Sequence, residues 1–250
     1  AEHRRQRAEG FFMRDQRVDG QPLTPAIVWQ DQRGVAVCQR MAADVHPDWL
    51  RHKTGLMLDS YFSAPKLRFV LDQNPVLRKR AANGEVRFGT TETWVLWQLS
   101  QGRLHVTDPS TASRTLLFDI NRLAWDEELL ALFDVPAVLL PQVAPSAGYV
   151  GELDFGTGHC YPLHALLVDQ QAALFGQACF APGTMKCTFG TGTFLLMNTG
   201  QQPRLSNHGL LTTVAWQIDG NVTYALDGGD FAAGAHRAGR PCPSAGARAA

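Results

Sequence analysis

The chain has 250 residues, of which 45% are hydrophobic and 18% charged, and its acidic and basic residues balance to a formal net charge of zero. Such a composition is typical of a globular protein with a substantial core, in one large or two smaller domains. Zero net charge gives no indication of a nucleic-acid partner, and no apolar run approaches the ~20 residues needed to cross a bilayer. The arginine-containing N-terminus has no apolar segment behind it and is not a secretory signal. We therefore expect a cytoplasmic protein without nucleic-acid or membrane partners; homo-oligomerisation stays open.

The cysteines indicate reduced thiols. They are odd in number, isolated and without CxxC spacing: Cys38, Cys160, Cys179, Cys187 and Cys242. Reduced thiols fit this pattern better than a disulfide framework or a zinc site. His159, Cys160 and His164 lie close together, but their spacing matches no standard set of metal ligands, so we predict no metal site there.

The N-terminal half is predicted to be helix-rich, with few strands. Residues 1–25 are polar and irregular, the apolar run Ala26–Trp29 predicts a strand, and Lys53–Ser63 is loop-like. Lys66–Leu71 opens a helix whose polar side is expected to carry Arg68, Arg78, Lys79 and Arg80.

Two more helices are expected before residue 136. Thr90–Gly102 has apolar residues at helical spacing and a terminating glycine. Its Trp94 and Trp97 are interpreted as core residues, with a stacking platform for sugars as the alternative. DINRLAWDEELLALFDVP is read as an amphipathic helix that Pro136 closes.

One acid stands at a predicted strand–helix junction. The apolar run Leu163–Val168 reads as a buried strand, Asp169 follows it, and Gln170–Gln177 favours a helix. From these residues alone, two interpretations of Asp169 stay open: an N-cap for the helix, or a carboxylate that faces a cleft and performs chemistry.

The last third of the chain is predicted to form strands. MKCTFGTGTFLLMN reads as two strands around Gly190-Thr191-Gly192, and LLTTVAWQIDGNVTYAL as two around Asp219-Gly220-Asn221. We expect a β-meander from Met185 with no helix to cover it, a domain boundary near Pro182-Gly183, and a disordered tail over residues 236–250.

Seven ordered blocks carry a resemblance to a known family: PAIVWQDQR (Pro25–Arg33), KTGLMLDSYFSAPKLRFVLDQN (Lys53–Asn74), FGTTETWVLWQL (Phe88–Leu99), HVTDPSTASRTLLFDI (His105–Ile120), DQQAALFGQACF (Asp169–Phe180), FGTGTFLLMNTG (Phe189–Gly200) and GLLTTVAW (Gly209–Trp216). Over roughly Gly20–Gly234 the chain resembles the FGGY family of carbohydrate kinases, and most closely its glycerol-phosphorylating members. YFSAPKLRFVL looks like a family signature, with Phe69 where tryptophan is usual.

The resemblance implies an α/β, actin-like (ribonuclease H-like) two-domain kinase fold with the second domain truncated. Residues 1–181 would form the N-terminal domain without its first strands, and 182–235 the start of the C-terminal domain. The implied activity is transfer of the ATP γ-phosphate to glycerol, giving glycerol 3-phosphate, with ATP and Mg²⁺ as cofactors. The alternatives are another sugar or polyol as substrate, or a non-catalytic polyol-binding or interaction fragment.

The resemblance also assigns roles to residues. Asp169 is implied to be the catalytic base, although Val168 stands where the family usually has glycine. Tyr61 looks like the tyrosine that hydrogen-bonds the polyol, and Gln170 is a candidate for holding a substrate hydroxyl. The remaining implied residues are the aromatic walls Trp29 and Phe194 and the ATP-phosphate turn Gly190, Thr191 and Gly192.

Two family features have no counterpart in the sequence. No D-x-G-T phosphate motif precedes Gly20, and Arg7 and Glu9 do not match the family's substrate-binding Arg-Glu pair. The adenosine site would lie beyond Gly234, in the tail. Because electrostatic clamping supplies much of phosphoryl-transfer catalysis, we expect this chain on its own to be weakly active or inactive.

Overall fold

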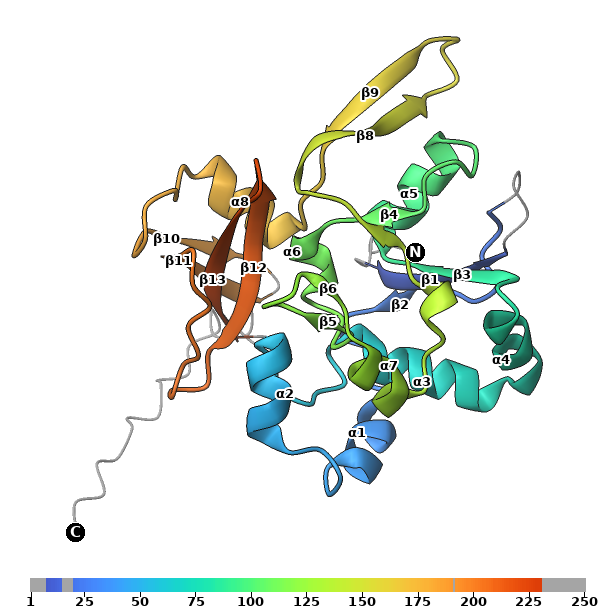
Figure 1. Ribbon diagram of the computed structural model, residues 1–250, viewed down its shortest axis with the longest axis horizontal. Helices are drawn as coiled ribbons and strands as arrows, with labels where there is room; N and C mark the ends of the chain where they lie inside the picture. The colour runs from blue at the N-terminus through green and yellow to red at the C-terminus, as the bar shows by residue number, and fades with distance from the viewer. Residues whose placement is uncertain (1–7, 15–19, 191, 231–250) are drawn as a thin grey trace, which may run out of the picture.

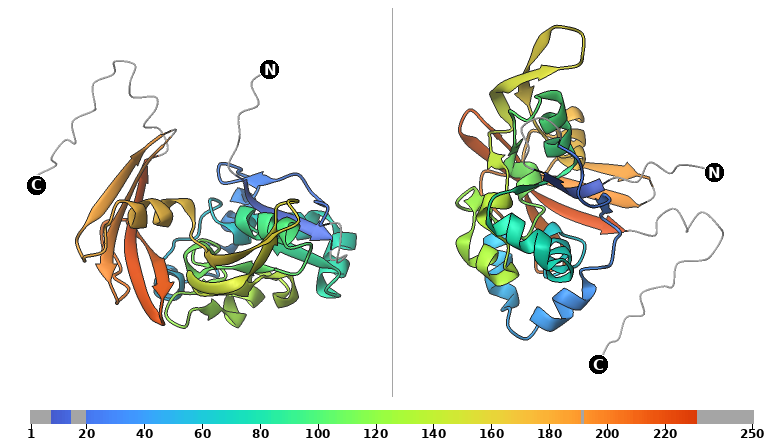
Figure 2. Two further views of the ribbon diagram at one scale, coloured as in Figure 1. Left: turned by 90° about the horizontal axis from the view of Figure 1, so that it is seen from above. Right: turned by 90° about the vertical axis from the view of Figure 1, so that its right-hand side faces the viewer.

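The computed structural model describes residues 8–14, 20–190 and 192–230. Figures 1 and 2 show a helix-rich part built from the first two thirds of the chain, with a four-stranded sheet beside it. Thr191, Cys242 and the tail expected over residues 236–250 lie outside the described residues.

The helix-rich part combines short helices with small sheets. Its elements in chain order are β1 (Ala8–Arg14), β2 (Ile27–Val28), α1 (Val35–Met41), α2 (Pro47–Thr54), α3 (Ser63–Gln73), α4 (Pro75–Ala82), β3 (Val86–Gly89), α5 (Thr91–Leu99), β4 (Val106–Thr107), α6 (Pro109–Ala112), β5 (Phe118–Asp119), β6 (Ala124–Trp125), α7 (Glu127–Phe133), the 3₁₀ turn η1 (Ala137–Leu139), β7 (Gln142–Val143), β8 (Ala147–Asp154) and β9 (Cys160–Ala165).

The expectation of an irregular segment over residues 1–25 was wrong, because β1 lies within it. β1 is the middle strand of a three-stranded antiparallel sheet of order β2-β1-β3. Its register pairs Phe12 with Phe88 of β3, a residue far along the chain. The apolar run Phe11–Met13 is short, and the strands that pair with it are brought to it by the fold.

The helix expected from Lys66 is two helices. Asn74 has φ −134° and ψ 87°, outside the helical region, and its side chain accepts a hydrogen bond from Leu77 N at 2.9 Å. Pro75 disfavours helical backbone at the preceding residue and fits the first position of a new helix. Arg78, Lys79 and Arg80 therefore belong to α4, and Arg68 to α3.

The helix expected over DINRLAWDEELLALFDVP is confined to α7. The preceding residues form the small hairpin of β5 and β6, in which Phe118 pairs with Trp125. The side chain of Asp126 caps α7 by accepting from Leu129 N at 3.0 Å, so the helix begins only after it.

The apolar run Leu163–Val168 is not a buried strand. β9 ends at Ala165, and its residues are exposed or half-buried. Among the described strands its partner is β8, and the resulting hairpin projects from the body of the protein, as Figure 1 shows.

The last part of the chain adds α8 (Asp169–Gly176), β10 (Met185–Phe189), β11 (Thr193–Gly200), β12 (Leu211–Ile218) and β13 (Asn221–Asp230). The four expected strands form, and Asp219 and Gly220 make the tight turn between β12 and β13, both with positive φ. The sheet order is β10-β11-β13-β12, so the expected simple meander was wrong: β13 lies between β11 and β12.

Both faces of this sheet are covered, contrary to the expectation of an uncovered sheet. On one face Leu174 of α8 packs with residues that include Leu196 and Ala215 of the strands. On the other face Val214 and Tyr224 pack with Phe118 and its neighbours from the helix-rich part. Because successive strand residues point to opposite faces, Val214 and Ala215 pack into two different hydrophobic clusters.

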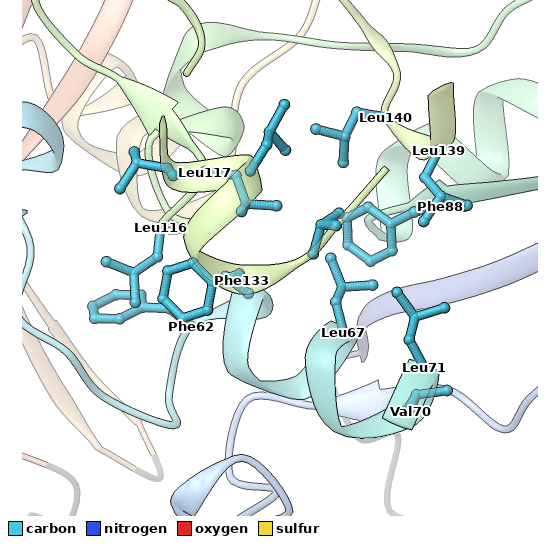
Figure 3. Close-up of a cluster of buried hydrophobic side chains, with 14 of the residues drawn as sticks. Phe62, Leu67, Val70, Leu71, Phe88, Leu116, Leu117, Phe133, Leu139 and Leu140 are labelled. Carbon is cyan, nitrogen blue, oxygen red and sulfur yellow. The ribbon is translucent and has the colours of Figure 1, made fainter. Parts of the chain in front are cut away.

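The largest core lies within the helix-rich part, where α3, α7, β3 and the segment around residues 116–117 meet, as Figure 3 shows. Phe133, Leu67 and Leu71 are among its fully buried side chains. Trp97 of α5 is also buried, as the core interpretation requires, whereas Trp94 is half-buried and donates from Nε1 to Gly20 O at 3.3 Å.

The described cysteines, Cys38, Cys160, Cys179 and Cys187, are free thiols. Burial raises the pKa of Cys38 to about 11. Within the described part of the chain, no helix is both long enough and apolar enough to cross a membrane.

Candidate active site

Three aromatic residues from distant segments meet at one place. The ring of Trp29, just after β2, lies edge-on to that of Tyr61 at 5.8 Å between centroids and to that of Phe194 on β11 at 6.1 Å. All three residues are half-buried. The sequence resemblance assigned these residues to one polyol pocket, and the fold brings them together.

A buried lysine fixes the two loops that carry Trp29 and Tyr61. Lys66 of α3 is 3% exposed, and its ammonium donates to Tyr61 O at 2.7 Å and to Trp29 O at 3.2 Å. A lysine is rarely buried unless it is paired, and here it ties two backbone segments to one helix. Lys66 lies in the YFSAPKLRFVL block, but no local pattern of residues indicates this role.

Arg114 connects the aromatic group to the four-stranded sheet. Its guanidinium lies 5.8 Å from the ring centroid of Tyr61 and 5.4 Å from that of Phe62, within the range of cation–π attraction. It also forms an ion pair of 2.8 Å with Asp227 on β13. Arg114 could not be found from local sequence patterns, since its partners come from two distant segments.

Asp169 is the first residue of α8, not its N-cap. The N-cap is Val168, with φ −66° and ψ 150°, and no side chain caps the helix there. The N-cap interpretation of Asp169 was therefore wrong. The side chain of Asp169 is exposed. The backbone of Val168 lies in a region open to branched residues, so replacing the family's usual glycine imposes no positive-φ strain.

A buried network anchors the start of α8. Val168 N donates to Ser110 Oγ at 3.0 Å, and Ser110 Oγ donates to Asp108 Oδ1 at 2.8 Å. Ser146 Oγ donates to the other oxygen of Asp108 at 2.7 Å. Burial raises the pKa of Asp108, although hydrogen bonds from Ser146, Thr111 and Ser110 oppose this effect. The backbone just before Asp169 is thus held by α6.

Gln170 joins Asp169 to the sheet. Its Nε2 donates to Asp169 Oδ2 at 3.1 Å, and its Oε1 accepts from Lys186 Nζ on β10. The same ammonium donates to Thr188 Oγ1 at 2.9 Å. Thr188 pairs directly with Phe194 across the β10–β11 ladder. A chain of contacts therefore runs from the carboxylate of Asp169 to the strand position that carries one aromatic wall.

The predicted phosphate turn connects β10 and β11. Gly190 N donates to Gly192 O at 2.9 Å, which closes the turn. Gly190 is exposed and Gly192 buried. A Cβ at Gly190 would meet nothing closer than Gly192 O at 3.7 Å, so its backbone is uncrowded.

The described residues contain no group of three or more His, Cys, Asp or Glu side chains that could hold a metal ion. Mg²⁺ in phosphotransferases usually takes only one or two carboxylates, and the nucleotide phosphates and water supply its other ligands. Asp169 offers one exposed carboxylate of that kind.

Comparison with known proteins identifies the family. Residues 5–176 match the model for the N-terminal domain of the FGGY family of carbohydrate kinases. Glycerol kinase of Halorhodospira halophila is 52% identical over 223 residues, which is 86% of this chain and 43% of the relative. Glycerol kinase of Thermus brockianus is 52% identical over 221 residues, or 88% of this chain and 45% of the relative. The chain thus spans less than half the length of these curated relatives.

Solved structures agree with this match. Plasmodium falciparum glycerol kinase with ADP superposes with a TM-score of 0.87 at 34% identity, covering 93% of this chain and 46% of that one. Xylulose kinase from Rhodospirillum rubrum superposes with a TM-score of 0.77 at 18% identity, over 90% and 45% of the two chains, which shows a shared fold. The predicted actin-like α/β fold is confirmed, and the chain belongs to the FGGY family of carbohydrate kinases.

Proposed function

We propose that this chain provides the polyol pocket and the catalytic base of an ATP-dependent glycerol kinase, which makes glycerol 3-phosphate. One observation carries the proposal: Trp29, Tyr61 and Phe194 converge in a chain that is 52% identical to glycerol kinases over most of its length. Aromatic walls with a few polar groups suit a small ligand that is apolar on its carbon chain and polar at its hydroxyls.

Each side chain has a defined part in this pocket. Trp29 and Phe194 would contact the carbon chain of glycerol, and the phenol of Tyr61 would hydrogen-bond one hydroxyl. Gln170 would hold a second hydroxyl beside Asp169. The backbone bonds from Lys66 would keep Trp29 and Tyr61 at a fixed separation while the ligand binds.

The chemical step follows from general phosphoryl-transfer chemistry. Asp169 would accept the proton of the terminal hydroxyl while that oxygen bonds to the γ-phosphorus. The bond from phosphorus to the β,γ-bridging oxygen breaks, and ADP leaves with the electron pair. A general base typically accelerates a reaction 10²–10⁴-fold, so Asp169 need not account for the whole rate enhancement.

The nucleotide would bind with its phosphates at the turn of Gly190, Thr191 and Gly192. The open space around Gly190 would let a phosphate approach the turn closely. Mg²⁺, when bound, would neutralise charge that develops on the phosphates. A cytoplasmic location is part of this proposal, and the free thiols of the described cysteines support it.

The test is phosphotransfer by the purified chain. Because the chain spans less than half the length of its relatives, we expect at most slow turnover. ³¹P NMR after long incubation should detect glycerol 3-phosphate formed from ATP, Mg²⁺ and glycerol, and isothermal titration should detect glycerol binding. Asp169→Asn should lower turnover by about 100-fold or more and leave glycerol affinity within about threefold. Asp44→Asn, which changes an exposed acid, is the control.

Other outcomes separate the alternatives. Turnover with another polyol but not with glycerol would keep the fold and change the substrate. Binding of glycerol without turnover, unaffected by nucleotide, would identify a non-catalytic polyol-binding module. Loss of both binding and turnover in Asp169→Asn would contradict the base role and indicate a structural one.

A further inference from the structure

Lys186 is a buried cation next to the candidate base. It is 5% exposed, although it lies on β10, whose neighbours Met185 and Cys187 are exposed. Burial of a lysine is costly unless its ammonium is hydrogen-bonded or paired. Its ammonium contacts Gln170 Oε1 and Thr188 Oγ1, so the residue is directed inward toward α8.

The chemistry of lysine fixes which way the Gln170 amide faces. An ammonium only donates hydrogen bonds, so the Gln170 atom that faces Lys186 must be the carbonyl oxygen. The amide nitrogen is then turned to Asp169, where it donates to Oδ2 at 3.1 Å. An amide turned the other way would place its oxygen against the carboxylate and its N–H₂ against the ammonium, and both contacts would be repulsive.

We infer that Lys186 is a positioning residue that acts through Gln170 on Asp169. By fixing the amide, it keeps an N–H donor on one carboxylate oxygen and so sets the direction in which the carboxylate faces the acceptor hydroxyl. It also sets the orientation of the amide that would meet the second polyol hydroxyl. This inference rests on the proposed function and adds a residue to the same site.

The surrounding charges make this role specific to Lys186. α8 packs against β10, β11 and β12, and Lys186 is the one charged residue in these three strands. The neighbouring strand β13 carries the buried acid Asp227, which forms its ion pair with Arg114. Asp108, the N-cap of α6, is connected to the start of α8 through Ser110.

A double-mutant cycle tests the inference. Lys186→Met keeps the side-chain length and removes the donor, and it should lower kcat roughly 10- to 100-fold, the range expected when a reacting group is misplaced by about 1 Å. In a Gln170→Ala background the same substitution should have almost no further effect, because the residue through which it acts is gone. Lys186→Arg should restore part of the activity, and Lys79→Met, at an exposed site on α4, should change nothing.

A second readout does not depend on turnover. The side-chain amide protons of Gln170, assigned by their absence in Gln170→Ala, should shift in ¹H–¹⁵N spectra of both Lys186→Met and Asp169→Asn, but not of Lys79→Met. Unchanged amide resonances in Lys186→Met, or an equal loss of kcat with and without Gln170, would overturn the inference. If the wild-type chain neither binds glycerol nor shows turnover, the proposed function fails, while the spectra still test the contact from Lys186 through Gln170 to Asp169.

Discussion

At the scale of single residues, Asp126 shows how one carboxylate serves two structural tasks. It is 1% exposed; its Oδ1 caps α7, and its Oδ2 accepts from Lys53 Nζ at 2.6 Å. Burial opposes ionisation, but the hydrogen bonds from Lys53 and from the Leu129 N–H outweigh it, so the pKa of Asp126 is lowered. The ionised form is therefore more stable in the folded protein than in the unfolded chain.

We expect Asp126→Asn to destabilise the fold at neutral pH. Asparagine can still cap α7, but it loses the charged bond to Lys53, a kind of contact worth about 1.5–3 kcal/mol. Because the folded pKa lies below the unfolded value of about 3.9, this stability is complete above that value and is lost as the pH falls through the folded pKa.

Urea unfolding at several pH values checks this expectation. The difference in free energy of unfolding between wild type and Asp126→Asn should be constant from about pH 7 to pH 5 and shrink below about pH 4. Asp44→Asn, at an exposed position, should stay within about 0.5 kcal/mol of wild type. A difference that grows on acidification would contradict the assignment of the charged bond.

At the scale of elements, two glycines with the same backbone requirement differ in their surroundings. Gly55 ends α2 with φ +73°, and a Cβ there would lie 2.2 Å from Thr212 O on β12. Gly220 has φ +75° in the β12–β13 turn, and a Cβ there would meet nothing within 4 Å. Positive φ costs a residue with a Cβ roughly 1–2 kcal/mol. A substitution at Gly220 would meet that cost alone, whereas one at Gly55 would also bring its Cβ into collision with the backbone of β12.

The two alanine variants should therefore separate clearly. Gly220→Ala is expected to lose about 1–2 kcal/mol of stability, and Gly55→Ala about 3 kcal/mol or more, because β12 must move as well. Gly176→Ala, at the last residue of α8 with open space around it, should be neutral or slightly stabilising. Equal losses of stability in Gly55→Ala and Gly220→Ala would contradict this prediction, because they would mean that β12 moves away from Gly55 at little cost in free energy.

Sequence alone predicted the elements whose signals are local. The β12–β13 hairpin was found because Asp219-Gly220 is a tight-turn signal between two segments rich in β-branched and aromatic residues. β1 and the sheet order were missed because pairing with distant strands leaves no mark in a local window. Arg114 was missed for the same reason: Tyr61 and Asp227 meet it only in the fold. Trp29, Tyr61 and Phe194 were proposed through family resemblance, not through periodicity.

At the scale of the whole molecule, the helix-rich part and the four-stranded sheet share a core and several hydrogen bonds. Ser113 Oγ and Thr213 Oγ1 lie 2.8 Å apart and are both buried, and Thr212 N donates to Gly55 O at 2.9 Å. Tyr224 of β13, 5% exposed, donates from its phenol to Ile120 O at 2.8 Å. Neither part can lose its structure without exposing the shared cluster of Ala112, Phe118, Ile120, Val214 and Tyr224.

This shared core predicts that the two parts unfold together. Tyr224→Phe keeps the packing and leaves the buried Ile120 carbonyl without that donor, which should cost about 1–3 kcal/mol. Hydrogen exchange should then speed up by the same factor for amides of α3, which lies far from the substitution, and for amides of β13. Tyr149→Phe, on the projecting hairpin where the side chain is 66% exposed, should alter neither set. Faster exchange confined to β13 would mean instead that the sheet opens by itself and that Phe194 can separate from Trp29 without global unfolding.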